Sequence, residues 1–396
     1  MHGEIPTVAV AGHICLDIIP ALSHRHRLED VLVPGNLVGV GAAVLATGGA
    51  VANTGLALHK LGVSTRLMGK VGDDFLGQVI IGILEKEHPG LSEQMIIKSG
   101  ECSSYSIVIS PPDVDRIFLH HSGTNDTFDS NDLDIAQLEH VSLFHFGYPP
   151  LMRHMYEDNG AHLEEMLRRV KKQGITTSLD MARPDPQSDA GRADWPTILQ
   201  RTLPYVDVFL PSLEEILFML DPDGTEYSLK AQQHSAVDGE ILSRVSRQLL
   251  EWGAGIVGIK LGDQGLYLRT SLSEQRLSQM GIGFSSTIEE WTARELLAPC
   301  FSVDVVGTTG AGDCTVAGFL AALLYGMNPE DAMTRAVAVG AFNVESADAT
   351  SGIQSFKAVE KRVMSGWKRR LVTVPLHGWT WEETRGIWRG PNDQKE

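Results

Sequence analysis

The sequence predicts an α/β protein in which a parallel β-sheet is covered by helices on both faces. From residue 141 onward, short apolar segments alternate with longer segments whose apolar residues recur at helical spacing. Strands that alternate with helices form parallel sheets, because each helix returns the chain to the same edge. The 396 residues suffice for one large domain of this kind or for two smaller ones.

The first part of the chain predicts two strand–helix pairs and a hairpin. A buried strand is expected within 7–20, and a glycine-rich stretch leads from it to an apolar helix at 51–62. A second strand at 64–72 precedes a helix at 75–87. Residues 103–121 have the pattern of two strands around the turn PPDVD, which is typical of a β-hairpin.

The alternation is clearest in the second part of the chain. Ligands of such sheets bind beyond the carboxyl ends of the strands, so the loops that follow these strands are the expected binding region. The expected strands lie at 141–147, 175–181, 206–211, 254–262 and 265–270, and the expected helices at 161–174, 195–203, 213–220, 241–253 and after 310.

Three segments do not follow the alternation. Residues 221–239 and 271–300 are polar and show no sustained period, which predicts surface insertions. The tail from Thr373 holds three tryptophans close together. Because exposed tryptophans are uncommon, we expect the tail to dock on the body of the protein or on a partner subunit. The tryptophans are Trp379, Trp381 and Trp388.

Composition narrows the class of protein. Lys and Arg number 33 and Asp and Glu 50, which gives a net charge of −17 and argues against broad contact with nucleic acid or an anionic membrane. No apolar run reaches the ~18 residues of a membrane span. The four cysteines have no metal-type spacing, and no secretory leader is evident, so we expect reduced thiols in a cytoplasmic protein.

The most informative motif is GTTGAGD at 307–313, which opens directly into an apolar helix. Gly310 and Gly312 let the backbone turn and let a ligand approach it closely. The unpaired amides at the helix start, with the helix dipole, form an anion site. An acid such as Asp313 repels an anion, so its position beside an anion site is unexpected in a purely structural loop. The position makes sense if the carboxylate removes a proton from a hydroxyl that then attacks a bound phosphate. The structural alternative is a glycine turn with an acid that the helix dipole favours.

Two further motifs point to hydroxyl binding, and each has a structural alternative. Gly48 and Gly49 precede Asn53 at the start of a helix. They serve either the geometry of a turn or a close approach of a polyol to the Asn53 amide. Asp17 follows the apolar core of the first strand and is either a solvated acid or an acceptor for ligand hydroxyls.

Two motifs point to nucleotide and metal binding. IKLGDQG at 259–265 predicts a tight turn between strands, where Gly262 and Gly265 would let a nucleotide lie against the backbone. LPSLEEI at 210–216 places Glu214 and Glu215 at a helix start, where they complement the helix dipole or hold the water shell of magnesium.

Several common catalytic patterns are absent from the sequence. There is no P-loop GxxxxGK[ST] and no GxSxG nucleophile elbow. The 14 histidines lack HxxxH or HxxE spacing in a plausible metal context, so we expect them on the surface and in packing.

Taken in order, the motifs resemble the ribokinase-like (PfkB) family of carbohydrate and nucleoside kinases over residues 7–365. The matching segments are GGAVANTGLALHKLG, GKVGDDFLG, IKLGDQGLYL and GTTGAGDCTVAGFLAALLYG. The resemblance implies a Rossmann-type three-layer αβα domain over 1–372 with a small β-sheet lid, and leaves 373–396 as a C-terminal extension. The lid would come roughly from 14–45 and 101–122. ATP as donor, Mg²⁺ and a hydroxyl acceptor are also implied.

The resemblance also implies roles for individual residues. Asp313 would be the catalytic base, and Gly310, Ala311 and Gly312 would supply the anion-hole amides. The acceptor would meet Asp17, Gly48, Gly49, Asn53 and, on the lid, Arg116. The nucleotide would meet Lys260, Gly262, Gly265, Thr309, Ala349 and Gly352, and Glu215 would lie near the metal.

Two departures from the family pattern bear on ion use. Many relatives read DTxGAGD, in which the aspartate helps to hold a monovalent cation, whereas Gly307 fills that position here. We therefore expect little activation by potassium. The NxxE motif near the magnesium appears as Ser212-Leu213-Glu214-Glu215, which keeps the acid and replaces the amide by a hydroxyl. We expect magnesium dependence to survive.

These features favour an ATP-dependent sugar kinase that acts on a small sugar or related polyol. A nucleoside kinase of the same fold remains an alternative, with Tyr105 and Phe118 as candidate aromatic contacts. A catalytically idle sugar or nucleotide sensor is the second alternative, because Gly307 and Ser212 depart from the pattern. Exposed strand edges in the lid favour a homodimer through the lid. Arg116 and Arg183 are candidates for an acidic group on the acceptor, or else surface ion-pair residues.

Overall fold

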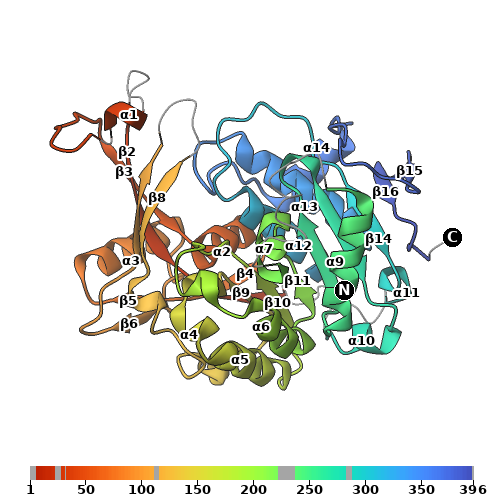
Figure 1. Ribbon diagram of the computed structural model, residues 1–396, viewed down its shortest axis with the longest axis horizontal. Helices are drawn as coiled ribbons and strands as arrows, with labels where there is room; N and C mark the ends of the chain where they lie inside the picture. Colours follow the sequence, from red (N-terminus) through yellow and green to blue (C-terminus); the bar gives the residue numbers. More distant parts are fainter. Residues whose placement is uncertain are drawn as a thin grey trace.

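The computed structural model describes residues 6–22, 28–31, 33–110, 116–221, 237–281 and 288–394 (Figure 1). A ten-stranded sheet forms its centre. In spatial order its strands are β15 (Thr380–Glu382), β16 (Ile387–Arg389), β14 (Glu295–Ala298), β13 (Leu266–Thr270), β12 (Ile256–Lys260), β11 (Val208–Phe209), β10 (Thr176–Asp180), β9 (Val141–Gly147), β1 (Thr7–Gly12) and β4 (Ser64–Met68).

The main sheet is parallel from β4 to β12, as the sequence predicts, and antiparallel beyond. The change occurs at the glycine turn between β12 and β13. Gly265 has φ 114°, and a Cβ there would lie 2.0 Å from the carbonyl oxygen of Ala298. Only glycine fits this turn, so the chain folds straight back as an antiparallel strand instead of crossing over through a helix.

Helices cover both faces of this sheet. Side chains alternate along a strand, so Val8 and Val10 of β1 pack into one core while Ala9 and Ala11 pack into the other. The result is a three-layer αβα arrangement. The first core is covered by α2 (Ala50–Lys60), α12 (Ala311–Leu324), α13 (Pro329–Val344) and α14 (Phe356–Met364), and the second by α4 (Arg153–Tyr156), α5 (Ala161–Lys171), α6 (Trp195–Thr202), α7 (Leu213–Leu220) and α9 (Gly239–Glu251).

A four-stranded sheet stands at the opposite end of the molecule from β15 and β16 (Figure 1). We call it the small sheet. Helix α3 (Phe75–Glu87) packs against it. Its strands in spatial order are β3 (Ala43–Gly48), β2 (Cys15–Pro20), β7 (Tyr105–Ile109) and β8 (Ile117–His121). The last two form the antiparallel hairpin expected from the sequence, and its turn at 111–115 lies outside the described residues.

The remaining elements are short. β5 (Lys70–Gly72) and β6 (Ile96–Lys98) form a two-stranded parallel pair. The other short helices are α1 (Leu28–Val31), α10 (Glu274–Ser278) and α11 (Ile288–Trp291), with 3₁₀ turns at Gly123–Asn125, Ile135–Leu138, Pro149–Leu151, Glu157–Asn159, Ala190–Arg192, Leu203–Tyr205 and Gly262–Gln264.

The expectation that residues 271–300 form a surface insertion is wrong. This segment contains β14, whose four residues are all buried inside the main sheet. An apolar run this short shows no measurable period, which explains why the pattern did not reveal it. Most of the other expected insertion, residues 222–236, lies outside the described part of the chain.

The C-terminal tail adds two strands to the main sheet. β16 pairs with β14, and Trp379 is buried with its ring 6.0 Å from that of Tyr267. Arg294, whose side chain is fully buried, forms an ion pair with Asp393 at 2.9 Å. The tail thus docks on the body of its own chain and completes one end of the sheet.

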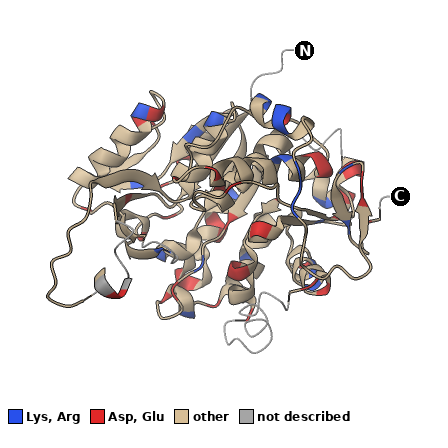
Figure 2. Ribbon diagram, turned by 90° about the horizontal axis from the view of Figure 1, so that it is seen from above, with Lys and Arg blue, Asp and Glu red and all other residues tan. Residues whose placement is uncertain are grey.

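The surface carries both signs of charge. Figure 2 shows Lys and Arg interspersed with Asp and Glu along the helices, while the strands are mostly uncharged. Within the described residues, no helix has the length and apolar character that a membrane crossing requires.

Candidate active site

The glycine loop presents free amides at the start of α12. Gly310 caps the helix in the left-handed region, with φ 71°, and no side chain among the described residues caps it. The Ala311 amide donates to the Thr308 carbonyl at 3.3 Å, whereas no backbone acceptor for the amides of Gly312 and Asp313 is found in the described part of the chain. These two amides, more than that of Ala311, are available to an anion.

Asp313 is held beside these amides by three donors. Asn53 Nδ2 donates to its Oδ2 at 3.0 Å, and the hydroxyls of Tyr148 and Thr54 donate to its Oδ1 at 2.7 and 3.4 Å. The Asp313 residue is 4% exposed. Burial, together with the charge of Asp313, holds the pKa of Tyr148 well above its ordinary value, so the phenol remains a donor. The carboxylate is thereby fixed in one orientation.

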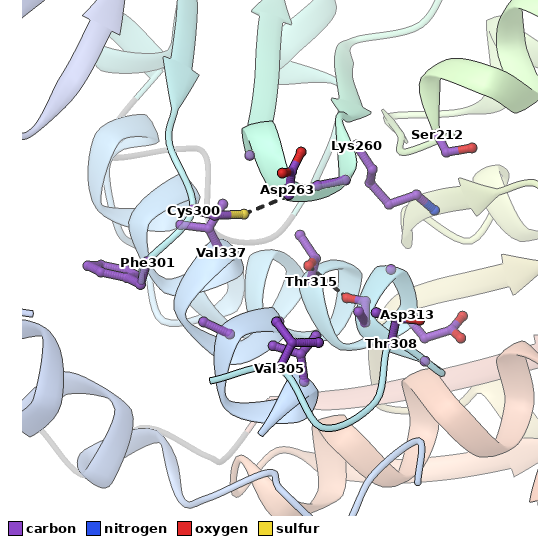
Figure 3. Close-up of a pocket in the computed structure, with 18 of the residues that line it drawn as sticks. Ser212, Lys260, Asp263, Cys300, Phe301, Val305, Thr308, Asp313, Thr315 and Val337 are labelled. Atoms are coloured by element: carbon purple, nitrogen blue, oxygen red, sulfur yellow. Dashed lines mark hydrogen bonds between the residues drawn. The ribbon is translucent and has the colours of Figure 1, made fainter. Parts of the chain in front are cut away.

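A cavity of about 440 Å³ lies in front of the loop and Asp313. Figure 3 shows Lys260 reaching in from the end of β12, with Asp313 across from it and Cys300, Phe301 and Val337 at the far end. One end of the cavity is therefore charged and the other apolar. Its further lining includes Tyr148, Met181, Ser212, Glu215, Gly262, Asp263, Gly265, Val303, Val305, Thr308, Gly310, Ala311, Gly312, Thr315, Gly340, Ala341, Val344 and Arg370.

Three carboxylates surround the ammonium group of Lys260. Its Nζ lies 2.5 Å from Asp180 Oδ1, and the charges of Glu215 and Asp313 also act on it. Burial alone would lower the pKa of Lys260, but the carboxylates outweigh it and the pKa is raised. Burial raises the pKa of Asp180 to about 7, against the attraction of Lys260, and also raises that of Glu215. One ammonium among three acids leaves this end of the cavity with excess negative charge.

On its other side, Asp313 approaches the small sheet. The ring of Tyr148, which donates to Asp313, lies 6.1 Å from the ring of His13 at the junction of β1 and β2. Gly48 and Gly49 are needed here because a Cβ at Gly48 would meet Asp17 Oδ2 at 2.4 Å and one at Gly49 would meet His13. Arg116, the residue before β8, reaches back to the glycine loop and donates to Thr308 Oγ1 at 3.1 Å.

Comparison with known proteins decides the family. The profile of the pfkB family carbohydrate kinases matches residues 6–355, most of the chain. The chain belongs to this family. It is therefore a carbohydrate kinase, a phosphotransferase with an alcohol group as acceptor.

Individual relatives are distant but cover most of the chain. An uncharacterized sugar kinase of Archaeoglobus fulgidus is 25% identical over 75% of this chain and 98% of that protein. The 2-dehydro-3-deoxygluconokinase of Bacillus subtilis is 25% identical over 77% of this chain and 82% of that protein. The structure of Arabidopsis thaliana ribokinase complexed with ribose and ATP shares the fold, with a TM-score of 0.68, 20% identity, and coverage of 90% of this chain and 98% of that one.

Most of the sequence-predicted residues of this kinase fall into two groups. One group meets at the cavity, where Asp313 bonds Asn53 and shares the lining with the glycine loop, Lys260, Gly262, Gly265 and Glu215. Asp17, Gly48, Gly49 and Arg116 lie together at the small sheet. The lining does not include Thr309, Ala349 or Gly352. Thr308 lines the cavity in place of Thr309, and Ala349 backs Gly310, where a Cβ would meet it at 2.8 Å.

Three residues at the site were not singled out in the sequence. Tyr148 follows β9, Asp180 ends β10 and Thr54 lies one residue after Asn53 in α2. Tyr148 and Asp180 both stand at carboxyl ends of parallel strands, the edge where ligands bind. Their position at the ends of predicted strands could have indicated a role in binding, but no recognisable sequence motif includes either residue.

The donor set suits a magnesium ion. Glu215 lines the cavity, and its Oε2 accepts from the Ser212 amide at 2.6 Å while Ser212 Oγ accepts from the Glu215 amide, a capping box at the start of α7. Asp180 Oδ2 is buried and has no hydrogen-bond partner among the described residues. An unpaired carboxylate oxygen beside a second carboxylate is a donor set that Mg²⁺ accepts, directly or through water.

Proposed function

We propose that this carbohydrate kinase transfers the γ-phosphoryl group of ATP to a hydroxyl of a small sugar, with Asp313 as general base. The observation that carries the proposal is the position of Asp313. Its buried carboxylate lies beside the free amides of Gly312 and of Asp313 itself, and it faces a cavity that Lys260 also enters. A hydroxyl beside Asp313 and a phosphate on these amides would meet in line.

The residues around Asp313 have distinct tasks in this proposal. Asn53 and Tyr148 fix the carboxylate, so that its free lone pairs point to the acceptor hydroxyl. The amides of Gly312 and Asp313, with the positive end of the α12 dipole, stabilise the charge of the transferred group. Because an aspartate is a weak base for an alcohol, the proton moves late, when the attacking oxygen has become acidic.

ATP as donor is supported by the shape of the cavity. Its apolar end, with Phe301, Val305 and Val337, suits a base, and its charged end suits the phosphates. The ammonium group of Lys260, a compact positive charge, is positioned to bind a phosphate oxygen. The Arabidopsis ribokinase of the same fold was solved with ATP.

Asp180 and Glu215 would hold Mg²⁺ at the charged end, with Ser212 keeping Glu215 in place through the capping box. Bound Mg²⁺ would supply charge neutralisation between the phosphates. Without the metal, the three carboxylates around the single ammonium group of Lys260 would repel a polyphosphate.

The acceptor would lie between Asp313 and the small sheet, which would act as a lid. Asp17 and Asn53 offer acceptors and donors to sugar hydroxyls. Arg116, just before β8, links the small sheet to Thr308 of the glycine loop. A nucleoside acceptor needs an aromatic face, but Tyr105 is engaged with His121 at 5.5 Å, while Phe118 is 52% exposed. The sugar kinase is therefore the better fit.

A homodimer through the small sheet is part of the proposal. Val44, Leu45, Phe118 and Leu119 of this sheet are exposed, which is unusual for an isolated monomer. Mass measurement by light scattering checks it, since a single species of 43.1 kDa would contradict a dimer.

A panel of substrates tests the function. ATP, Mg²⁺ and the purified chain are incubated with pentoses, hexoses, acidic sugars and nucleosides, and phosphorylated products are detected by mass spectrometry. The proposal predicts a phosphorylated sugar and stoichiometric ADP. Turnover of nucleosides alone would favour the nucleoside kinase, and binding of ATP and sugar without any transfer would favour the sensor.

A further inference from the structure

Three potential metal ligands meet at the junction of the two sheets, next to Tyr148 of the cavity wall. His13 lies between β1 and β2, Cys15 begins β2 and His120 is in β8. Their ligand atoms lie within 4.8 Å of one another. The two histidine Nε2 atoms are 3.3 Å apart.

The distance between the two nitrogen atoms matches tetrahedral coordination. Two Zn–N bonds of about 2.0–2.1 Å at the tetrahedral angle place their nitrogens about 3.3 Å apart. A thiolate with two imidazoles is a donor set that selects zinc over magnesium, because magnesium prefers oxygen ligands. Three protein ligands leave a fourth position for water, as in zinc sites that remain open.

Hydrogen bonds behind the cluster orient one of the ligands. Ser106 hydrogen-bonds the Asp17 carboxylate and lies 3.0 Å from His120 Nδ1. Since a carboxylate only accepts, the Ser106 hydroxyl donates to Asp17 and its oxygen accepts from His120 Nδ1–H. The proton of His120 is then on Nδ1, and its Nε2 lone pair faces His13. A carboxylate–hydroxyl–imidazole chain of this kind positions metal-binding histidines.

Burial and exposure also suit an ion. His13 and Cys15 are 2% and 3% exposed, while His120 lies on the exposed strand β8, which leaves an entry path. A hydrogen bond from one imidazole to the other would account for the 3.3 Å contact alone. The Cys15 thiol donates to Asp17 Oδ1 at 3.4 Å and converges on the same point as the two imidazoles.

We propose that His13, Cys15 and His120 bind one Zn²⁺ ion at the junction of the small sheet and the main sheet. On binding, the Cys15 S–H bond breaks, its proton passes to solvent and an S–Zn bond forms, with no oxidant involved. The ion ties β8 to the connection between β1 and β2. It is separate from the Mg²⁺ position beside Glu215.

Cobalt substitution tests this site without any catalytic assay. The metal-free full-length chain is titrated with Co²⁺, whose bond to a thiolate gives a charge-transfer band in the near ultraviolet. We expect one equivalent of Co²⁺ to produce the band, a stoichiometric amount of Zn²⁺ to abolish it, and a large excess of Mg²⁺ to leave it unchanged. Absence of the band in the wild-type chain would overturn the proposal.

Variants assign the ligands. Cys15→Ala should abolish the band, and His120→Ala should weaken Co²⁺ binding by about 100-fold or more. His121→Ala and Cys102→Ser are the matched controls, because His121 points to Tyr105 on the other side of β8 and Cys102 is exposed. Both controls should keep the band. Because His120 is on the surface, its variant remains informative even if Cys15→Ala fails to fold, and unchanged Co²⁺ affinity in His120→Ala would contradict the site.

Discussion

At the scale of single residues, the balance of charge around Lys260 decides how the cavity behaves. Its ammonium group lies 2.5 Å from Asp180, and Glu215 and Asp313 act on both groups. Breaking a buried ion pair on one side leaves an uncompensated charge, which is costly. We therefore expect the protonation of Asp180 to change the activity of the enzyme in a measurable way.

We expect the rate to fall as the pH drops through about 7, the raised pKa of Asp180. Below it the carboxyl is neutral and no longer balances Lys260 or attracts a metal, so kcat/KM should fall about tenfold per pH unit. Because the pKa of Asp180 is higher in the folded than in the unfolded protein, its protonation adds to the stability of the folded state as the pH falls from about 7 toward 4. The loss of rate in this range is therefore not expected to come from unfolding through Asp180. The measurement is kcat/KM against pH, with melting temperature recorded in parallel.

Asp180→Asn serves as the comparison for that profile. It should have a lower rate, and the acidic limb near pH 7 should disappear. An unchanged limb in Asp180→Asn would show that another group titrates.

Some residues of the site could be predicted from the sequence and others could not. Asp313 and Asn53 were predicted to act in one site, and they are in hydrogen-bond contact although 260 positions separate them. Their motifs made this possible, since each stands at a glycine-rich helix start. Tyr148 and Asp180 follow strands without such a motif, and only the register of β9 and β10 brings them to the same edge. His13, Cys15 and His120 were missed because the cluster closes across 107 positions.

At the scale of elements, the start of α12 separates structural from functional glycines. A Cβ at Gly310 would meet Ala349 at 2.8 Å, and the residue has φ 71°. A Cβ at Gly312 would have ordinary contact with Lys260, 3.6 Å from Cδ, but would enter the cavity.

Substitution by alanine should therefore affect the two positions differently. Gly310→Ala should lower the free energy of unfolding by about 1–2 kcal/mol or more, because alanine is strained at positive φ. Gly312→Ala should keep near-normal stability while the KM for ATP rises roughly tenfold, since the methyl stands where a phosphate approaches the amides. Chemical unfolding and steady-state kinetics measure the two effects. Equal loss of stability in both variants would contradict the assignment.

The loop before α12 should make the enzyme insensitive to potassium. A Cβ at Gly307 would lie 2.9 Å from the carbonyl oxygens of Ser346 and Ala347, so the backbone of this loop leaves little room for a side chain there. We expect the rate in K⁺ and in Na⁺ of equal ionic strength to agree within about twofold, since Gly307 offers no carboxylate to attract the ion. A steep K⁺ dependence would show that other groups bind it.

Helices and strands could be predicted where the segment was long enough to show a periodic pattern of apolar residues. The helices at 51–62 and 161–174 were expected from their apolar spacing and are present as α2 and α5. β14 was missed because it has four residues, and β15 and β16 have three each. Such strands exist because the neighbouring strand supplies their hydrogen bonds, and this tertiary contribution leaves no pattern in the local sequence.

At the scale of the whole molecule, the C-terminal tail locks one end of the main sheet. Its Asp393 pairs with Arg294, which also pairs with Glu330 of α13 at 2.5 Å. The fully buried Arg294 side chain depends on both acids, so the tail holds β14 and α13 together.

Asp393→Ala should destabilise the fold by about 3–5 kcal/mol, because it leaves a buried guanidinium short of one partner. Arg385→Ala is the control, since its 3.4 Å pair with Asp331 is exposed and should contribute less than about 1 kcal/mol. Urea unfolding monitored by fluorescence compares the two variants. Similar midpoints would show that the tail does not stabilise the sheet.

In the proposed reaction Asp313 removes the proton from the acceptor hydroxyl, and the turnover number of Asp313→Asn is the sharpest test of this role. Asparagine keeps the size of the side chain but cannot accept the proton, so kcat should fall by about 10²–10⁴ while the far-ultraviolet spectrum stays unchanged. Asp304→Asn, an exposed acid before the same loop, should keep its kcat. A folded Asp313→Asn enzyme with kcat within about threefold of wild type would contradict the account.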